Sequence, residues 1–396
     1  MPYAQDRIIH DADSHLMELP GCLDAYFDPG LKQRFLDLPY YRDKIAKAAF
    51  ADKVRAEQAD AGFRAGADEN ILLRKNYQAL GAFLPEDRPR TLDLLGFASQ
   101  LVFTTFCLNN FGLDQSEDLD LCYAAAQAHN RMMTDFCSVD QRLLATGYVP
   151  LEDFDRALTT AKEAIALGCK ALLIPSRCPR RHAPSHIRFD PLWALAQEAG
   201  LPILFHVGGE EKINPAYFEN GLPRVKDFHG GEENFTSVSF MPIPYSVMQT
   251  LSALIFDGVL DRFPRLKFGA IELGAAWAPS WMRFMDSAHA AFNKNEERLR
   301  NLSARPSEIV RRQVRITPYP HEDTAWIVAN TGEEVCLFSS DFPHVEGGRN
   351  PLKRFDDALA NASSSAIERF YRDNFVDLMG AGLSQGLLRP KHLQAA

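Results

Sequence analysis

The sequence predicts an α/β protein folded as a (β/α)8 barrel, a TIM barrel, and two features lead to this prediction. Eight short apolar segments alternate with amphipathic helical segments along a single chain of 396 residues. Near-continuous apolar strands that alternate with helices are typical of a parallel sheet buried on both faces. The alternative is a doubly wound open sheet, which normally has a glycine-rich turn after its first strand. Because neither GxGxxG nor GxxxxGK[ST] occurs, a barrel of one domain, residues 1–396, is favoured.

The eight expected strands are runs rich in Val, Ile, Leu and Phe, and their lengths suit a barrel. They are residues 6–13, 98–106, 143–150, 170–176, 201–209, 266–274, 314–319 and 335–344. Helices are expected between them wherever apolar residues recur every three or four positions, and two of these helices are followed by glycine, a common stop signal. They are residues 119–137, 151–168, 189–200, 246–263, 277–301, 321–332 and 366–379.

Two segments depart from this alternation. Residues 19–95 are charged and prone to form helices, with apolar residues at helical spacing in 31–38, 42–58 and 90–97. We expect them to form a helical insertion after strand 1 that builds a wall or lid over the strand ends. Residues 210–240 are rich in glycine, asparagine and charge, and are expected as a long active-site loop.

Composition excludes several classes of protein. The net charge of −9 and a pI near 5.7 argue against nucleic acid or an anionic membrane as a partner. No apolar segment of membrane-spanning length is expected, and the first residues lack the apolar core of a signal peptide. The seven cysteines are scattered without a CxxC pair, which indicates neither a disulfide framework nor a zinc ribbon. A reduced, cytoplasmic location is therefore expected.

The first strand ends in an unusual run of polar side chains. In IIHDADSHLME, residues Asp11, Asp13 and His15 occupy every second position. Alternate residues of a strand share one face, so two carboxylates and an imidazole would be presented together. Oxygen and nitrogen ligands of this kind suit a divalent metal ion. The alternative is a loop whose polar groups are satisfied and bind nothing.

Other polar side chains fall at the ends of later strands, where barrels collect their catalytic groups. His206 ends the fifth strand, Glu272 the sixth, Asp341 and His344 lie at the eighth, and Arg177 follows the fourth. Each also has a structural interpretation. His206 can be a core histidine bonded to the backbone, Asp341 can cap a turn, and Glu272 can pair with an arginine.

Five stretches resemble one known family: DADSH, LPILFHVGG, DRFPRLKFGAIELGAAWAP, SSDFPH and DNFVDLMG. They resemble the amidohydrolase superfamily. Within it the sequence is most similar to the amidohydrolase-related group that includes aminocarboxymuconate-semialdehyde decarboxylase and several hydroxybenzoate decarboxylases. The stretches span almost the whole chain, and DRFPRLK before the sixth strand together with SDFPH is their most specific combination.

The resemblance implies a TIM barrel that holds one divalent metal ion, zinc, manganese or magnesium. The implied ligands are Asp13, His15, His206 and Asp341. Asp13 stands where the family usually has histidine or glutamate, and a carboxylate there favours a harder ion such as Mn²⁺ or Mg²⁺. Glu272 stands where the family commonly has a histidine, so the resemblance leaves either Asp341 or Glu272 as the catalytic acid or base.

The expected function is that of a metal-dependent non-oxidative decarboxylase, a carboxy-lyase, of an aromatic or unsaturated carboxylic acid. Arg177, His344 and Trp277 are the expected contacts to this small-molecule substrate. The alternative is a metal-dependent hydrolase or hydratase that uses the same residues, with water as the nucleophile. A third interpretation is a metal-free barrel that binds a ligand without catalysis. The resemblance also implies a homodimer.

Overall fold

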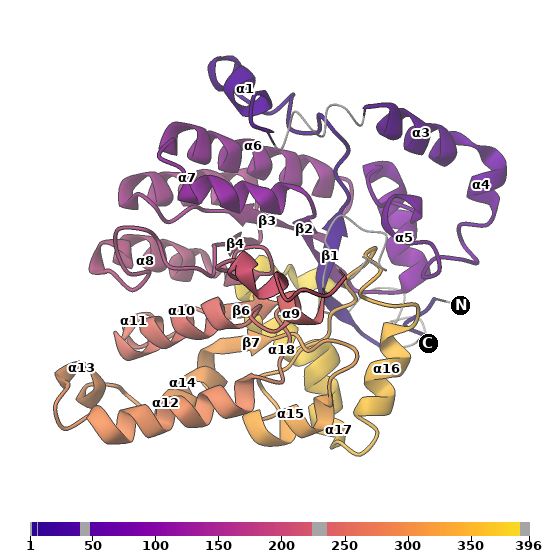
Figure 1. Ribbon diagram of the computed structural model, residues 1–396. Coiled ribbons are helices and arrows are strands. Elements are labelled where there is room, and N and C mark those ends of the chain that lie inside the picture. The colour runs from indigo at the N-terminus through magenta and orange to yellow at the C-terminus, as the bar shows by residue number, and fades with distance from the viewer. Residues whose placement is uncertain (1, 6, 40–47, 224–235, 389–396) are drawn as a thin grey trace.

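The centre of the molecule is a parallel sheet of seven strands in the order β1 to β7 (Figure 1). The computed structural model describes residues 2–5, 7–39, 48–223 and 236–388. The strands are β1 (His10–Leu16), β2 (Ser99–Thr104), β3 (Leu143–Tyr148), β4 (Ala171–Leu173), β5 (Ile203–His206), β6 (Phe268–Ile271) and β7 (Val314–Ile316). All seven lie within or close to expected strands, and every residue in them is buried. The arrangement is consistent with a TIM barrel.

The expected eighth strand is present only as isolated bridges between Ser14 and Phe342 and between Ile316 and Cys336. Its backbone nevertheless bonds to both edges of the sheet. Ile316 N donates to Val335 O at 2.9 Å on the β7 side, and His15 N donates to Phe342 O at 2.7 Å on the β1 side. Residues 335–342 therefore span the gap between β7 and β1.

Alternation along the strands divides the apolar side chains into an inner and an outer core. Leu101 and Phe103 of β2 pack in the inner cluster together with Leu204 and with Phe375 of α18. Val102, which lies between them, packs in the outer cluster beneath the helices. Because successive strand residues face opposite sides, the inside of the sheet is filled by side chains, as in a barrel.

The helices that follow β2 lie mostly outside the sheet, along the left and lower sides of Figure 1; α16 lies at the right, and α18 packs against the inner cluster. They are α6 (Leu119–Cys137), α7 (Phe154–Leu167), α8 (Asp190–Ala199), α9 (Ser237–Phe240), α10 (Tyr245–Phe256), α11 (Val259–Arg262), α12 (Ala278–Phe292), α13 (Glu297–Arg300), α14 (Pro306–Gln313), α15 (Thr324–Thr331), α16 (Pro351–Ala358), α17 (Ser364–Glu368) and α18 (Asn374–Met379). The expected helix 246–263 is divided at Gly258, whose φ of 73° is left-handed. The expected helix 277–301 ends at Phe292 and resumes as α13.

Among the described residues, four α-helices lie between β1 and β2: α1 (Pro29–Leu36), α3 (Ala48–Ala59), α4 (Ala61–Ala65) and α5 (Arg88–Leu95). Residues 40–47, the first part of the expected helix 42–58, lie outside the described residues. Several hydrogen bonds join the segment to the strand ends. Among them, Tyr77 Oη donates to Glu18 O at 3.0 Å, and Asn76 N donates to Pro343 O at 2.9 Å. Its role as a wall or lid stays a prediction.

One helical stretch of the described residues, Ser237–Phe256, is long and apolar enough to cross a membrane by length and composition alone. The core helices of globular proteins pass the same test, and Val247, Leu251 and Leu254 of this stretch are buried against the protein.

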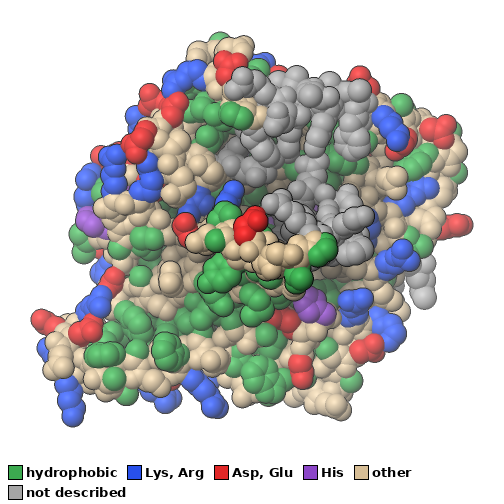
Figure 2. Space-filling view, viewed as in Figure 1, with side chains coloured by type: hydrophobic (Ala, Val, Ile, Leu, Met, Phe, Trp, Pro, Cys, Tyr) green, Lys and Arg blue, Asp and Glu red, His purple; other side chains and the backbone are tan. Residues whose placement is uncertain are grey.

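The surface also exposes apolar side chains over α12, where Figure 2 shows a hydrophobic area. Phe284 and Phe292 are 78% and 52% exposed there.

Candidate metal centre

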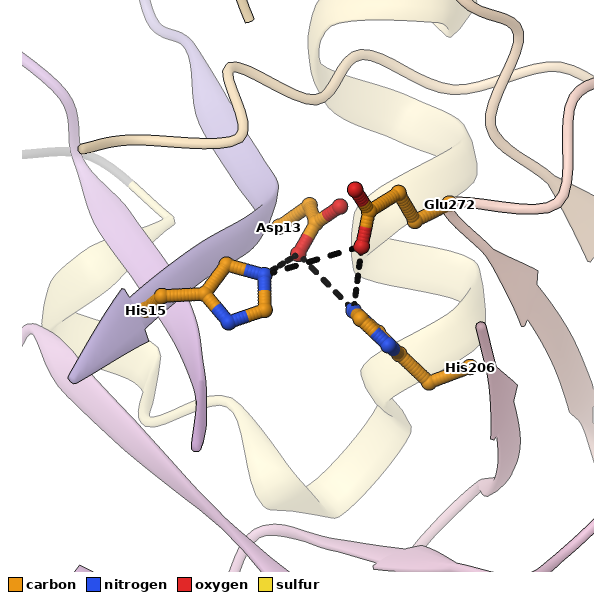
Figure 3. Close-up of side chains that lie close together, drawn as sticks. All are labelled: Asp13, His15, His206 and Glu272. Carbon is orange, nitrogen blue, oxygen red and sulfur yellow. Dashed lines mark hydrogen bonds and ion pairs between the residues drawn. The ribbon is translucent and has the colours of Figure 1, made fainter. Parts of the chain in front are cut away.

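Four side chains from three strands converge in the interior (Figure 3). Asp13 and His15 come from β1, His206 ends β5, and Glu272 directly follows β6. His206 Nε2 lies 3.2 Å from Glu272 Oε2 and 3.4 Å from Asp13 Oδ1. His15 Nε2 lies 3.2 Å from Asp13 Oδ1 and 3.8 Å from Glu272 Oε2. One atom of each lies within 4.8 Å of the others, and all four residues are buried.

The Nδ1 atoms of His15 and His206 bond to backbone carbonyls, so the Nε2 atoms are the ones that face the cluster. His15 Nδ1 lies 3.0 Å from Thr104 O, and His206 Nδ1 lies 3.1 Å from Val207 O. A carbonyl oxygen only accepts hydrogen bonds, so each Nδ1 carries the proton that it donates. In the neutral imidazole the Nε2 lone pairs then point at the carboxylates, which is the arrangement of metal-ligating histidines.

The charge states of the cluster suit a cation. Burial, together with the charge of the neighbouring His344, lowers the pKa of His15 to about 4. Burial alone would raise the pKa of Asp13, but its contacts with His15 and His206 outweigh this and hold that pKa below its usual range. A neutral imidazole and an ionised carboxylate are the forms that bind metal.

Asp341 and His344 flank this cluster. Asp341 Oδ1 lies 3.5 Å from His15 Nε2 and 2.8 Å from His344 Nδ1. The other nitrogen of His344 lies 2.9 Å from Thr105 Oγ1. Burial lowers the pKa of His344, but the charge and hydrogen bond of Asp341 dominate and raise it to about 9. Asp341 therefore faces a cationic imidazole on one side and the cluster on the other.

Glu272 and Asp341 both have left-handed backbones, with φ of 55° and 53°. This conformation is uncommon for residues other than glycine and concentrates at functional sites. At Glu272, the amide donates to Thr317 Oγ1 at 2.9 Å, and the carbonyl accepts from Tyr319 Oη at 2.8 Å. At Asp341, the amide donates to Asp13 O at 2.9 Å. The unusual backbone is therefore held on defined partners at both residues.

The Asp11 carboxylate holds the segment that carries Asp341 against β1 and β2. Its carboxylate accepts from Ser340 N at 2.7 Å, from Ser340 Oγ at 2.6 Å and from Gln100 Nε2 at 2.7 Å. These bonds join β1 to β2 and to the segment that carries Asp341. They also divert Ser340 N from a sheet ladder, which explains why residues 335–344 do not form a regular strand.

Arg177 and Trp277 are not part of the cluster. Arg177 is buried, and its Nη2 lies 3.6 Å from Asp114 Oδ2. Trp277 Nε1 donates to Gly274 O at 2.8 Å, and its ring packs edge-on against Trp281 at 5.2 Å. Trp277 is also absent from the lining of the cavity at Glu272. A substrate contact by either residue stays a prediction.

A cavity of about 310 Å³ opens at Glu272. Its aromatic wall is formed by Phe240, Tyr319 and His321, with Tyr319 and His321 stacked at 5.4 Å and 6°. The full lining is Thr236, Ser237, Phe240, Ile243, Glu272, Tyr319, His321 and Glu346. The expected loop 210–240 thus contributes to this wall, but its residues 224–235 lie outside the described residues.

Sequence reasoning missed Tyr319, His321 and Phe240, and it also missed Lys75. Lys75 is half-buried, next to the Asn76 amide that bonds to Pro343. Burial lowers the pKa of its ammonium, whereas the nearby charges of Asp341 and Glu346 act the other way. A lysine in a polar stretch gives no sequence signal, because its place at the site follows only from the path of the chain.

Two imidazole nitrogens and buried carboxylates around one point are the ligand chemistry of a divalent metal. Asp13 Oδ2 and His15 Nε2 are buried and have no hydrogen-bond partner among the described residues, so the residues present fit such an ion. Their position at the carboxyl ends of parallel strands is that of the active site in metal-dependent α/β enzymes.

Comparison with known proteins places the chain within this class. The family model for amidohydrolases matches residues 82–378. The chain therefore belongs to the amidohydrolase family and is a metal-dependent enzyme of that superfamily. This confirms the resemblance seen in the sequence. A search of curated proteins found no match.

Solved structures share the fold over nearly the whole chain. An amidohydrolase from Mycobacterium avium subsp. paratuberculosis superposes with a TM-score of 0.70 at 20% identity, covering 94% of this chain and 99% of the other. The 5-carboxyvanillate decarboxylase of Novosphingobium aromaticivorans, in complex with manganese and 4-hydroxy-3-methoxy-5-nitrobenzoic acid, gives 0.62 at 16%, covering 96% and 97%. A dihydroxybenzoic acid decarboxylase from Polaromonas sp. JS666, with manganese and 2-nitroresorcinol bound, gives 0.59 at 13%, covering 96% and 99%. These identities establish the fold and leave the reaction open.

Proposed function

We propose that the protein is a metal-dependent non-oxidative decarboxylase of an aromatic or unsaturated carboxylic acid. The observation that carries this proposal is the cavity at Glu272, which joins an aromatic wall to the histidine–carboxylate cluster. Phe240, Tyr319 and His321 offer flat faces on which a planar substrate can stack. Structural neighbours with this fold include decarboxylases of hydroxylated benzoic acids.

The proposed ligands are Asp13, His15, His206 and Asp341, with Glu272 beside them. When bound, a divalent ion supplies a Lewis acid that can chelate a carboxylate and an adjacent hydroxyl or carbonyl oxygen. Manganese in two structural neighbours supports a hard ion, in keeping with the carboxylates of this site.

The protein's own residues then handle one proton. A carboxylic acid at Asp341 or Glu272 gives its proton to the carbon that carries the substrate's carboxylate. The new C–H bond uses a π electron pair of the substrate. The bond between that carbon and the carboxylate then breaks, its electron pair restores the π system, and CO₂ leaves. His344, bonded to Asp341 and Thr105, can return a proton to Asp341. Lys75 adds a positive charge close to Asp341, which suits an anionic substrate.

A hydrolase or hydratase is the second candidate, and the amidohydrolase family match is the observation that favours it. In that reaction Asp341 takes a proton from the attacking water and later delivers it to the leaving group. A metal-free binding barrel is a less favoured third candidate, because it leaves the buried cluster without a counter-charge.

The test is to incubate the purified, Mn²⁺-loaded protein with a panel of hydroxybenzoates and related unsaturated acids. We expect CO₂ release and formation of the matching phenol, both lost in His206→Ala. Cleavage of esters, lactones, amides or C–C bonds without CO₂ release would replace this proposal with the hydrolase.

We also propose that the protein is cytoplasmic and forms a homodimer. Phe284 and Phe292 on α12 are exposed in the single copy and suit a contact between copies. Light scattering after size-exclusion chromatography measures the mass in solution, and a mass of one chain would contradict the dimer.

A further inference from the structure

We propose that Glu272 is itself a ligand of the divalent ion, in addition to the ligands proposed above, and that Asp341, paired with His344, carries the proton in place of Glu272. This inference rests on the proposed metal site. It gives a role as metal ligand to Glu272, the position at which the sequence departs most from the family.

The first argument is the convergence of lone pairs. His206 Nε2 lies 3.2 Å from Glu272 Oε2, closer than it lies to Asp13 Oδ1 at 3.4 Å. Because His206 Nδ1 donates to Val207 O, Nε2 is the nitrogen that faces the Glu272 oxygen. When Nε2 carries no proton, its lone pair and that of the carboxylate oxygen repel each other unless a cation lies between them. A metal ion at this point would be shared by Glu272 and His206.

The second argument is the backbone of Glu272. Its left-handed conformation is strained for a residue other than glycine, and it is held by Thr317 Oγ1 and Tyr319 Oη on both sides of the residue. Metal ligands need such fixed geometry, and outer groups that orient them are a regular part of metal sites.

The third argument is the contrast with Asp341. Its Oδ1 lies 2.8 Å from His344 Nδ1, and His344 in turn lies 2.9 Å from Thr105 Oγ1. Asp341 thus begins a chain of proton-bearing groups. Glu272 instead belongs to both groups whose ligand atoms lie within 4.8 Å of one another, Asp13–His15–His206–Glu272 and His15–Glu272–Asp341–His344, whereas Asp341 belongs only to the second.

Asp13 and Glu272 give the site carboxylate ligands beside the two imidazoles of His15 and His206. Carboxylate oxygen favours Mn²⁺ and Mg²⁺, whereas imidazole nitrogen also suits zinc. Replacing Glu272 by histidine should therefore keep a ligand but change the preference. We expect the affinity for Zn²⁺ relative to Mn²⁺ to rise at least about tenfold in Glu272→His.

The direct test is titration of the metal-stripped protein with Mn²⁺, followed by the electron paramagnetic resonance signal of free Mn²⁺. We expect Glu272→Gln to weaken binding at least about tenfold. The matched control is Glu346→Gln, which removes a carboxylate from the same cavity but outside the four-residue cluster. Its Mn²⁺ affinity should stay within about twofold of the wild type.

Mn²⁺ affinity in Glu272→Gln within twofold of the wild type would overturn the inference, and so would an equal loss in the Glu346→Gln control. Circular dichroism checks that each variant is folded. If Glu272→Gln does not fold, the ratio of Zn²⁺ to Mn²⁺ affinity in Glu272→His decides, and an unchanged ratio overturns the inference. Tight 1:1 Mn²⁺ binding that depends on Glu272, without CO₂ release, would overturn the proposed reaction while leaving this inference intact.

Discussion

His129 offers a sharp test of the hydrogen-bond network behind the metal centre. It is buried on α6, where its Nδ1 donates to Asn130 Oδ1 at 2.9 Å and its Nε2 lies 3.2 Å from Thr104 Oγ1. The carbonyl of the same Thr104 accepts from His15. Burial lowers the pKa of His129 from 6.5 to about 4, although its bond to Asn130 acts the other way. The neutral ring is therefore the form that stabilises the fold.

The sign and size of the effect follow from linkage. Between pH 6.5 and 4 the histidine of the unfolded chain binds a proton and the folded one does not, so lowering the pH favours unfolding. The stability that the neutral ring contributes is fully present above pH 6.5 and declines as the pH falls toward 4. The shift corresponds to about 3 kcal/mol lost between pH 7 and pH 4.

The perturbation is His129→Gln, which keeps a donor and an acceptor but cannot be protonated. Urea unfolding of the metal-stripped proteins at pH 7, 6, 5 and 4 gives the free energy of unfolding of each. We expect the wild type to lose about 3 kcal/mol more than the variant over this range. Other buried histidines contribute equally to both proteins and cancel in the difference. Parallel pH curves for the two proteins would refute the reasoning.

Two further predictions concern residues near Asp341 and Glu272. Lys75→Met should raise the dissociation constant of a hydroxybenzoate about tenfold or more, because a charge-assisted contact is worth about 1.5–3 kcal/mol. Calorimetry measures this constant, and Lys53→Met, at an exposed position on α3, is the control. Equal dissociation constants in the two variants would contradict the role of Lys75. Tyr319→Phe removes the hydroxyl that donates to the Glu272 carbonyl and should weaken Mn²⁺ binding about tenfold. Tyr217→Phe, at an exposed position, is the control. An unchanged Mn²⁺ affinity in Tyr319→Phe would show that the Tyr319 hydroxyl does not orient Glu272.

The local pattern of apolar residues was sufficient to locate the strands of the sheet. Apolar runs located all seven strands, because residues buried on both faces leave a continuous signal in the sequence. The segment 335–344 was expected as a regular strand but forms only bridges. Its pairing is interrupted by the bonds between Asp11 and Ser340, which lie 329 positions apart. No local pattern contains that information.

The same distinction between local sequence pattern and contacts between distant residues applies to the site. Asp13, His15, His206 and Asp341 were predicted as ligands, because the ends of parallel strands meet at one edge; the structure brings Glu272, predicted only as an acid or base, into the same cluster. The left-handed backbone of Glu272 could not, since it depends on Thr317 and Tyr319 more than forty positions further along the chain. Arg177 was expected near the substrate, but its ion pair with Asp114 requires a 3-10 segment, Cys107–Gln115, that no periodicity predicted.

The central claim is that the buried cluster binds one divalent metal ion. Inductively coupled plasma mass spectrometry of the purified protein, after incubation with Mn²⁺ and removal of the unbound metal, measures this directly. The geometry predicts one metal ion per chain in the wild type and none in His206→Ala. A wild-type protein without metal, or a His206→Ala variant that retains a full equivalent, would contradict it.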